Sequence, residues 1–378
     1  MKIGFMYNPS RNKFTGDYQK HVEGAREMAR FCEDSGFDSM WFGEHHFGFY
    51  GFATMPNPIM MGVDIAARTS RLRIGLASAT ITFWHPLRLA EDLALLDQFS
   101  NGRLEIGVGR GNHAIEGYNL NPMADPRVPE ENFAVFRETL EILRRALTRK
   151  SFSFEGEKYT FPRPGFTWDK RPVNNPDYVN QETNEVVSLP LMPPMVQNPA
   201  PFWQMVDSLR SVEFAGENDL GIIMWRPTVG RLKETFKVHN DKARAAGHDL
   251  PWGKGTGILR DTFVAASFDE AERIAGPSIM KHLNWTNWRG PSIYFDPGEE
   301  LPEEQVEALK KELTYDFVHP RSLLFGPPEY VVDKLEEMRE VLNIDQVLVN
   351  GFWDGIPEED AARSLKLFAE KVIPRLSR

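Results

Sequence analysis

Short apolar runs alternate with longer amphipathic stretches along most of the chain. Eight of the short runs have the length and composition of buried parallel strands, bounded by polar or glycine-containing turns. These eight runs are Ile3 to Tyr7, Ser39 to Phe42, Arg73 to Ala77, Leu104 to Gly107, Trp203 to Val206, Gly221 to Met224, Thr262 to Ala266 and Gln346 to Asn350.

Stretches with apolar residues at helical spacing lie between these runs. The clearest are Asp17 to Ser35, Pro86 to Phe99, Glu130 to Arg149, Val229 to Ala246, Phe268 to Lys281 and Glu358 to Ile373. This alternation is typical of a parallel sheet covered by helices, and eight repeats favour a closed (β/α)8 TIM barrel. Such a barrel takes about 250 residues. We therefore predict an α/β protein whose residues 1–378 form a single barrel domain with insertions.

Two segments without clear periodicity are predicted to be the insertions. The first, near 161–200, is rich in proline and asparagine. The second, near 277–315, contains the aromatic run Trp285-Thr286-Asn287-Trp288 and an acidic stretch from 297 to 304. Long loops inside a compact domain usually carry function. We therefore expect both insertions to shape the mouth of an active site.

The run Glu44-His45-His46 follows the predicted strand Ser39 to Phe42 directly. In parallel α/β folds, the loops at the carboxyl ends of strands bind ligands, so titratable groups concentrated there indicate chemistry. For His46 alone, a structural role as a hydrogen-bonding partner of a neighbouring loop is the better interpretation. A metal hydrolase that uses all three side chains is a remote alternative, because adjacent residues on a strand point in opposite directions.

Two further segments have the composition of anion sites. Gly107-Val108-Gly109-Arg110-Gly111 places an arginine among glycines at a strand end, where a ligand can approach the backbone closely. Asp207-Ser208-Leu209-Arg210-Ser211 supplies hydroxyls at a predicted helix start. Each signal is weak alone, and Ser208 is interpreted first as a helix N-cap.

Composition narrows the class of partner. The chain is 41% hydrophobic and 26% charged, and it carries a formal net charge of −10. An acidic protein lacks the basic surface that nucleic acid or anionic membrane requires, so a small metabolite is the expected ligand. The amino terminus lacks the order of a signal peptide, and no apolar stretch approaches the ~20 residues of a membrane span. The single cysteine, Cys32, excludes an internal disulfide and fits a buried helical position, so we expect a cytoplasmic protein.

Together these segments resemble the bacterial luciferase-like flavin-dependent monooxygenases over nearly the whole chain. The resemblance depends on the order and spacing of many segments, and it is weakest in the two insertions. The segments are Gly36 to Phe47, His85 to Asp92, Leu95 to Arg103, Gly107 to Gly111, Ser208 to Ala215, Phe325 to Glu329 as a turn before a helix, and Leu365 to Phe368.

The resemblance implies a luciferase-like TIM barrel that uses reduced FMN (FMNH2) and O2. In that family, a flavin hydroperoxide transfers one oxygen atom to a small apolar organic substrate. The implied protein is a homodimer, and a separate NAD(P)H:flavin reductase supplies the reduced flavin. No metal is implied.

Carried across to this sequence, the resemblance assigns roles to individual residues. His45 matches the catalytic histidine, and an imidazole side chain exchanges protons near neutral pH. Glu44 is implied to orient that imidazole or to support flavin binding. Arg110 matches the phosphate arginine, with Ser208 and Ser211 as further phosphate ligands. The remaining flavin contacts implied are Gly109, beside the isoalloxazine, and Ala77-Ser78, where the family carries a non-proline cis peptide.

Aromatic residues near these segments are candidates to line a substrate pocket. They are Phe49, Phe83, Trp84, His85, Trp225, Trp285 and Trp288. Each is equally compatible with a place in the core, and His85 is also a candidate helix N-cap before Pro86.

One position departs from the family. Where a second phosphate arginine often stands at the start of the helix from Glu130, this chain has Asn132-Phe133. Either Arg127 or Arg210 replaces that arginine, or FMN is held less tightly. The departure leaves open a deazaflavin-dependent dehydrogenase on the same barrel. A non-catalytic flavin-binding subunit is a third possibility, against which Glu44, His45 and Arg110 together speak.

Overall fold

Eight parallel strands close into a barrel in the computed structural model, which describes the whole chain except residues 9–17, 49–54, 169–174, 288–289 and 377–378. The ring closes where Lys2 of the first strand pairs with Gln346 of the last. Around the ring the strands are β1 (Lys2–Tyr7), β2 (Ser39–Phe42), β3 (Arg73–Leu76), β5 (Leu104–Gly109), β8 (Phe202–Met205), β9 (Gly221–Trp225), β10 (Thr256–Val264) and β12 (Gln346–Asn350). The predicted (β/α)8 fold is confirmed.

The seventh predicted strand was wrong in its start. β10 begins at Thr256 and pairs with β9 and β12, whereas the predicted run from Thr262 covers only its end. That end pairs with a short strand, β11 (Leu324–Gly326), where we predicted only a turn. The charged pair Arg260-Asp261 interrupts the apolar run, which hid the first half of β10. A second short strand, β4 (Ala79–Thr80), pairs with the end of β5.

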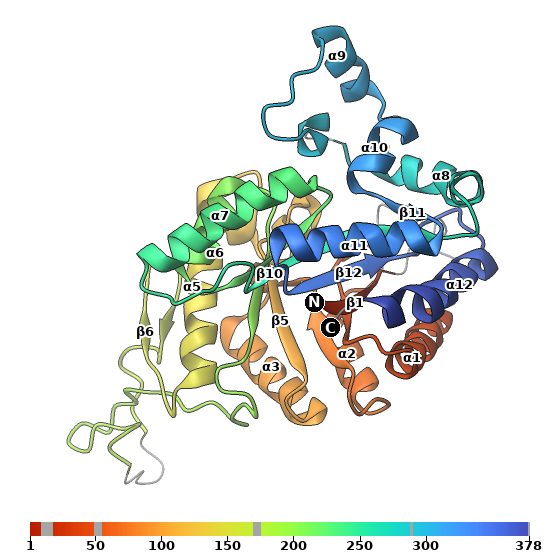
Figure 1. The fold of residues 1–378 in the computed structure, drawn as a ribbon. Coiled ribbons are helices and arrows are strands. Elements are labelled where there is room, and N and C mark those ends of the chain that lie inside the picture. Colours follow the sequence, from red (N-terminus) through yellow and green to blue (C-terminus); the bar gives the residue numbers. More distant parts are fainter. Residues whose placement is uncertain (9–17, 49–54, 169–174, 288–289, 377–378) are drawn as a thin grey trace.

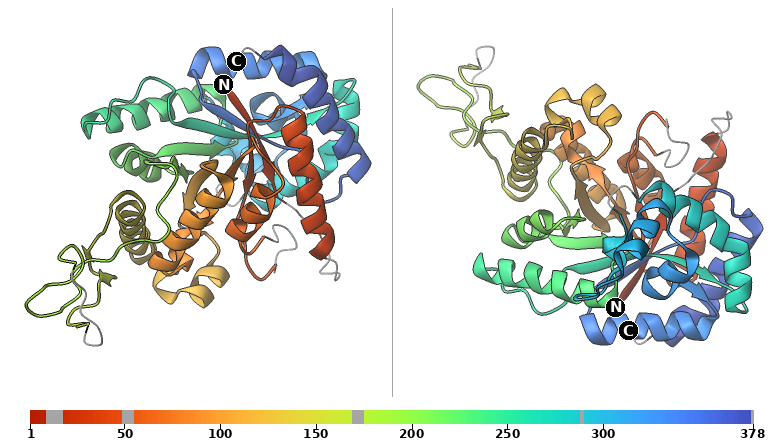
Figure 2. Two further views of the ribbon diagram at one scale, coloured as in Figure 1. Left: turned by 90° about the horizontal axis from the view of Figure 1, so that it is seen from below. Right: turned by 90° about the horizontal axis from the view of Figure 1, so that it is seen from above.

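Helices surround the barrel on its outer face (Figures 1 and 2). The larger ones are α1 (Tyr18–Asp34), α2 (Pro58–Ala66), α3 (Pro86–Ser100), α5 (Pro129–Thr148), α6 (Leu209–Glu217), α7 (Val229–Ala245), α8 (Phe268–Trp285), α11 (Pro328–Leu342) and α12 (Glu358–Leu367). Their bounds follow the predicted helices closely in most places. α8 continues through Pro277 to Trp285, so the second insertion starts later than predicted. Cys32 is fully buried in α1, as expected.

Two indoles fill the interior of the barrel. The rings of Trp41 and Trp203 meet edge to face, with 6.3 Å between their centroids. Glycines leave the space that the indoles occupy: a Cβ on Gly75 would lie 2.0 Å from Cδ2 of Trp41, and one on Gly221 would lie 2.5 Å from Cε3 of Trp203. Because interiors are close-packed, these positions admit no side chain without displacing an indole.

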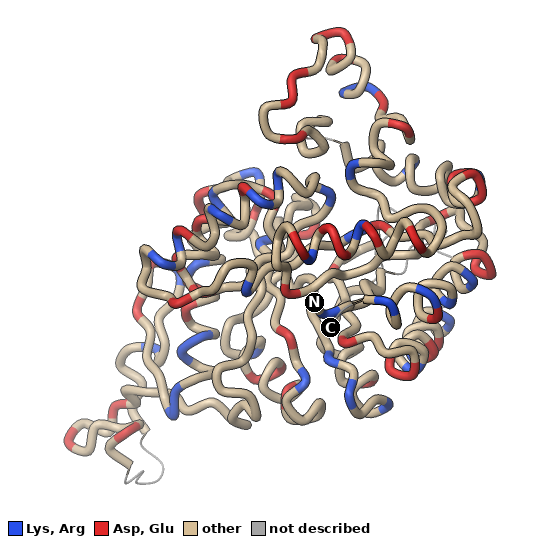
Figure 3. The backbone as a smooth tube through the Cα atoms, viewed as in Figure 1, with Lys and Arg blue, Asp and Glu red and all other residues tan. Residues whose placement is uncertain are grey.

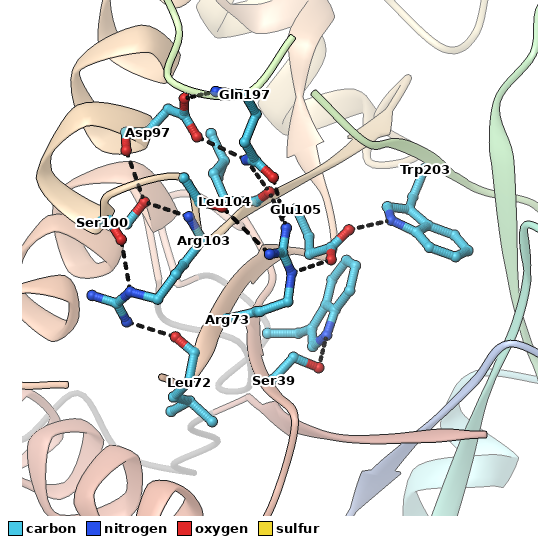
Figure 4. A network of polar contacts seen from close by, with 12 residues as sticks. Ser39, Leu72, Arg73, Asp97, Ser100, Arg103, Leu104, Glu105, Gln197 and Trp203 are labelled. Atoms are coloured by element: carbon cyan, nitrogen blue, oxygen red, sulfur yellow. Dashed lines mark hydrogen bonds and ion pairs between the residues drawn. The ribbon is translucent and has the colours of Figure 1, made fainter. Parts of the chain in front are cut away.

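The amino-terminal end of the barrel is closed by a polar network (Figure 4). Glu105 forms an ion pair with Arg73 and accepts a hydrogen bond from Trp203 Nε1 at 2.7 Å. Gln197 accepts a hydrogen bond from Arg73 at 2.9 Å and donates to Asp97 at 2.7 Å. This end of the first insertion therefore lies opposite the barrel's mouth, and our prediction that the insertion shapes the mouth is wrong for it.

The two insertions leave the barrel on different sides (Figure 1). The antiparallel pair β6 (Phe154–Glu155) and β7 (Thr160–Phe161) leads into the first. The second contains α9 (Glu303–Lys311) and α10 (Tyr315–Ser322), and α9 stands furthest from the barrel. Acidic and basic residues are interleaved over the molecule, most clearly along α11 (Figure 3). In the part of the chain that the structure describes, no helix is both long enough and apolar enough to cross a membrane.

Candidate active site

Glu44 anchors the loop that follows β2. Its side chain is buried and accepts hydrogen bonds from the Thr80 backbone N–H at 2.7 Å and from Trp84 Nε1 at 2.9 Å. Its Oε1 also lies 2.9 Å from Nε2 of His46. Glu44 therefore contacts His46 and not His45, so the first predicted role of Glu44 is wrong, and its alternative, support of flavin binding, stays a prediction. The side-chain partner of His46 lies in its own loop, where we expected one in a neighbouring loop.

His45 is held by a residue that the sequence analysis missed. Its Nδ1 lies 3.3 Å from Oε1 of Glu116, and the same oxygen accepts a hydrogen bond from the His46 backbone N–H at 2.8 Å. Glu116 belongs to the short helix α4 (Ala114–Leu120), and its side chain is only 3% exposed, against 31% for His45. The His113 ring lies beside His45, at 5.3 Å between centroids. The feature of the sequence that could have indicated Glu116 is the polar segment that directly follows Gly111.

The electrostatics of this group favour a charged carboxylate. Burial acts to raise the pKa of Glu116, but the hydrogen bond and charge of His45 and the His46 backbone N–H together hold that pKa below its usual value. Burial, with the nearby His45, lowers the pKa of His113. Glu116 is therefore ionised at neutral pH. It can fix the His45 tautomer that carries its proton on Nδ1, which leaves Nε2 for proton transfer.

The segment after β3 approaches the end of β5 closely. The peptide bond between Ala77 and Ser78 is cis, at the position where the resemblance implied one. A Cβ on Gly109 would lie 2.1 Å from Oγ of Ser78, so the Ser78 side chain packs directly against Gly109. The segment after β3 and the end of β5 are thus in close contact.

Hydroxyls and guanidinium groups gather where α6 begins. Ser208 caps the helix by accepting a hydrogen bond from the Ser211 backbone N–H, and its hydroxyl lies 3.0 Å from that of Ser211. The guanidinium groups of Arg110 and Arg210 lie over the ring of Phe133, 5.5 Å and 4.3 Å from its centroid. A helix amino terminus with two such cations nearby is suited to an anion.

Arg210, not Arg127, accompanies Arg110. Arg127 pairs with Asp125 at 2.6 Å, whereas Arg210 shares the Phe133 ring and pairs with Glu130 at the exposed surface. Asn132, which stands near the family's second arginine position, donates to the Arg110 backbone carbonyl at 3.0 Å.

The remaining candidates are scattered. The Phe83 ring lies 5.9 Å from that of His46, and Trp84 contacts Glu44 as described. His85 occupies the N-cap position of α3 without making a side-chain cap, and it packs against Phe161. Elsewhere, Trp225 lies at the end of β9, and Trp285 is 43% exposed at the end of α8. Phe49 and Trp288 lie outside the described residues.

Comparisons with known proteins identify the family of this chain. The sequence profile of the luciferase-like monooxygenases matches residues 1–343. The oxygenase component of the flavin-dependent trigonelline monooxygenase from Acinetobacter baylyi is 25% identical over 360 residues, which cover 93% of this chain and 89% of that protein.

Two solved structures share the fold. The FMN complex of the oxygenating constituent of 3,6-diketocamphane monooxygenase from Pseudomonas putida superposes with a TM-score of 0.78 at 19% identity, covering 100% of this chain and 99% of that one. The coenzyme F420-dependent tetrahydromethanopterin reductase from Methanopyrus kandleri gives a TM-score of 0.70 at 18% identity, with the same coverage.

Proposed function

Because this chain belongs to the luciferase-like monooxygenase family, we propose that it is the oxygenase component of a two-component flavin-dependent monooxygenase. It takes reduced FMN from a separate NAD(P)H:flavin reductase and uses O2 to oxygenate a small organic substrate. The observation that carries the proposal is the contact between His45 and Glu116, which joins the loop after β2 to the helix after β5 at the carboxyl-terminal end of the barrel. The name of the trigonelline relative, an oxygenase component, supports the division into two components.

The donor groups of the site fit FMN. The hydroxyls of Ser208 and Ser211 and the guanidinium groups of Arg110 and Arg210 match the oxygens of a phosphate monoester. The segment Ala77-Ser78, which packs against Gly109, is the part of the site that we assign to the isoalloxazine ring. When bound, reduced FMN supplies the reaction with O2, and the protein binds, orients and excludes water.

His45 is the proton-transfer residue of this proposal. The ionised carboxylate of Glu116 holds Nδ1–H, so Nε2 accepts a proton from the reacting groups or returns one to them. Glu44 keeps His46, Trp84 and Thr80 together and so sets the course of the loop that carries His45. A non-catalytic subunit needs no such histidine–carboxylate pair.

An exposed apolar surface supports a homodimer. Leu95 and Phe99 on α3 are 40% and 61% exposed, and Met60 on the adjacent α2 is 71% exposed. Val196, which is 47% exposed, joins them because its backbone N–H donates to Asp97 of α3. Apolar residues gathered in this way are typical of protein–protein contact.

Reoxidation of the flavin tests the proposed function. Reduced FMN mixed with the protein and oxygenated buffer should regain its oxidised absorbance more slowly than free reduced FMN, because the site shields the flavin from water. The deazaflavin alternative predicts tight binding of reduced coenzyme F420 and no protection of FMN. That second result would replace the monooxygenase by a hydride-transfer enzyme.

The phosphate contact gives a separate prediction. Arg110→Ala should weaken FMN binding by about 1.5 to 3 kcal/mol, the range for a hydrogen bond to a charged group, and should leave riboflavin binding unchanged. Arg127→Ala is the matched control, since Arg127 pairs with Asp125. Equilibrium dialysis of both flavins measures the difference. Equal binding of FMN and riboflavin by the wild type would refute this phosphate site.

A further inference from the structure

Two arginines are buried where β9 and β10 reach the mouth of the barrel. Arg226 directly follows β9 and is 8% exposed, and Arg260 lies in β10 and is fully buried. Fully buried arginines are rare unless a carboxylate pairs with them. Within the described residues, neither guanidinium forms an ion pair.

The hydrogen bonds of these two arginines are incomplete. Nη2 of Arg226 donates to Thr286 Oγ1 at 2.5 Å, and Nη2 of Arg260 donates to the Pro227 carbonyl at 2.5 Å. Nε of Arg226 and both Nε and Nη1 of Arg260 are buried without any hydrogen-bond partner. A buried donor left unpaired costs about 1 to 3 kcal/mol, and more when it is charged. The Arg226 guanidinium also lies over the Trp225 ring, 3.4 Å from its centroid, and interacts with the Tyr294 hydroxyl. The two unpaired donors of Arg260 remain, and they indicate that an acceptor is missing.

The nearby carboxylate does not fill this role. Asp261 acts on both guanidinium groups through its charge. Its oxygens, however, accept hydrogen bonds from neutral donors: Trp225 Nε1 at 2.9 Å, Asn350 Nδ2 at 2.9 Å and Trp353 Nε1 at 3.0 Å.

The other titratable groups that face the cluster are neutral. Burial lowers the pKa of His282 to about 4, raises that of Tyr294, and raises that of Tyr330, which acts on Arg260, to about 12. Burial also lowers the pKa of Arg260 to about 9, which still leaves it charged at neutral pH. Two guanidinium cations and one carboxylate therefore leave a single uncompensated positive charge in the protein interior.

We propose that Arg226 and Arg260 bind the carboxylate of the substrate, which makes the substrate an organic acid. A carboxylate carries the one negative charge that the cluster lacks, and its two oxygens suit the fixed forks of guanidinium groups. This inference rests on the proposed function, in which the substrate binds at the same mouth. It adds a substrate class and two specificity residues.

The position of the cluster fits that role. In the ring order of the strands, β2 and β9 lie on opposite sides of the barrel. A substrate whose carboxylate is held by Arg226 therefore extends its remaining part across the mouth toward His45, which follows β2. Thr286 and Tyr294 of the second insertion cover the cluster, being 9% and 1% exposed. They exclude the water that would otherwise weaken the ion pair.

Matched acids and amides test the proposal on the full-length protein without flavin. Benzoate and hexanoate are compared with benzamide and hexanamide by the shift in melting temperature in chloride-free buffer, because a ligand of the folded state raises that temperature. At least one acid should give a saturable rise that its amide does not give. Equal shifts by acid and amide, or no shift by either acid, would overturn the proposal. A chloride shift as large as that of the acids would also overturn it and assign a halide to the cluster.

Variants locate the effect. Arg226→Met and Arg260→Met should weaken acid binding at least tenfold, and Arg260→Lys, which keeps the charge and loses the fork, provides a second measurement if the methionine variants fold poorly. Arg231→Met is the matched control, because Arg231 contacts the same insertion at the Phe295 carbonyl, 3.1 Å away. Unchanged acid binding in the Arg226 and Arg260 variants would contradict the assignment.

Stability without ligand separates a binding site from a structural one. Removing an uncompensated buried charge should leave the melting temperature of Arg260→Met equal to or above that of the wild type. A clear decrease, together with unchanged acid binding, would make the arginines structural. Because these measurements need no flavin, they can fail while protection of reduced FMN persists, which would leave the proposed function standing.

Discussion

Replacing His45 with alanine is expected to lower the rate of product formation by about 10²- to 10⁴-fold, the usual contribution of a positioned proton-transfer group. Binding of reduced FMN should change little, because the phosphate site that we propose at Arg110 and the start of α6 remains. The measurement pairs kcat for an accepted substrate with the FMN dissociation constant. A variant that binds flavin normally and consumes O2 without forming product would place His45 in the oxygenation step.

The matched control for this variant is His248→Ala. His248 lies beyond the end of α7 and contacts the Glu217 carbonyl, on the outside of the barrel. Glu116→Gln gives a graded test, since it keeps the shape of the side chain and removes the charge next to His45. Its loss of kcat should be smaller than that of His45→Ala. Unchanged turnover in His45→Ala would remove His45 from the mechanism.

Gly75→Ala is expected to be among the most destabilising single substitutions in the protein. The new Cβ would lie 2.0 Å from the fully buried indole of Trp41. That indole donates a hydrogen bond to Ser39 at 2.8 Å and packs against Trp203, so it has little freedom to move. Overpacking of this kind costs about 1 to 3 kcal/mol and occasionally more, and we expect the upper end or complete loss of folding. Urea unfolding and soluble yield measure the effect.

Gly351→Ala is the control for this substitution. Gly351 follows β12, and a Cβ there meets only the Thr262 carbonyl at an ordinary 3.5 Å. Its free energy of unfolding should stay within about 1 kcal/mol of the wild type. Adding Trp41→Leu to Gly75→Ala should recover part of the lost stability by making room for the methyl group. If the two alanine variants were equally stable, this account of the barrel's packing would be wrong.

The barrel was predictable because its strands are buried on both faces. Seven of the eight predicted runs coincide with strands of the barrel, since short continuous apolar runs are typical of parallel strands that are buried on both faces. The exception is the seventh run, Thr262 to Ala266, which missed the first half of β10 because Arg260 and Asp261 interrupt the apolar residues. These are the residues whose burial is unusual, so the sequence was misleading at the point where the structure departs from ordinary packing.

The candidate site was predictable in its residues and less so in its partners. Glu44 and His45 are neighbours in sequence, which favoured pairing them, but the backbone turns between them. The partner of His45, Glu116, is separated from it by 71 positions. Such a contact depends on how the loop after β5 folds back over the loop after β2. The spacing of apolar residues along the chain carries no information about this contact. The sequence analysis did name Arg210, with Arg127, as a possible second phosphate arginine.

The network at the amino-terminal end of the barrel determines which parts of this chain can be exchanged with those of a relative. Asp97 and Gln197 bind each other across 100 positions, and Gln197 also binds Arg73. In a chimaera, replacing the first insertion therefore requires replacing the residues of α3, β3 and β5 that bind it. Otherwise the polar network at the amino-terminal end of the barrel is lost. Among the residues that the structure describes, the loop that carries Thr286 and Tyr294 contributes none to that network. It can be exchanged to alter substrate choice, and the barrel beneath it should still close.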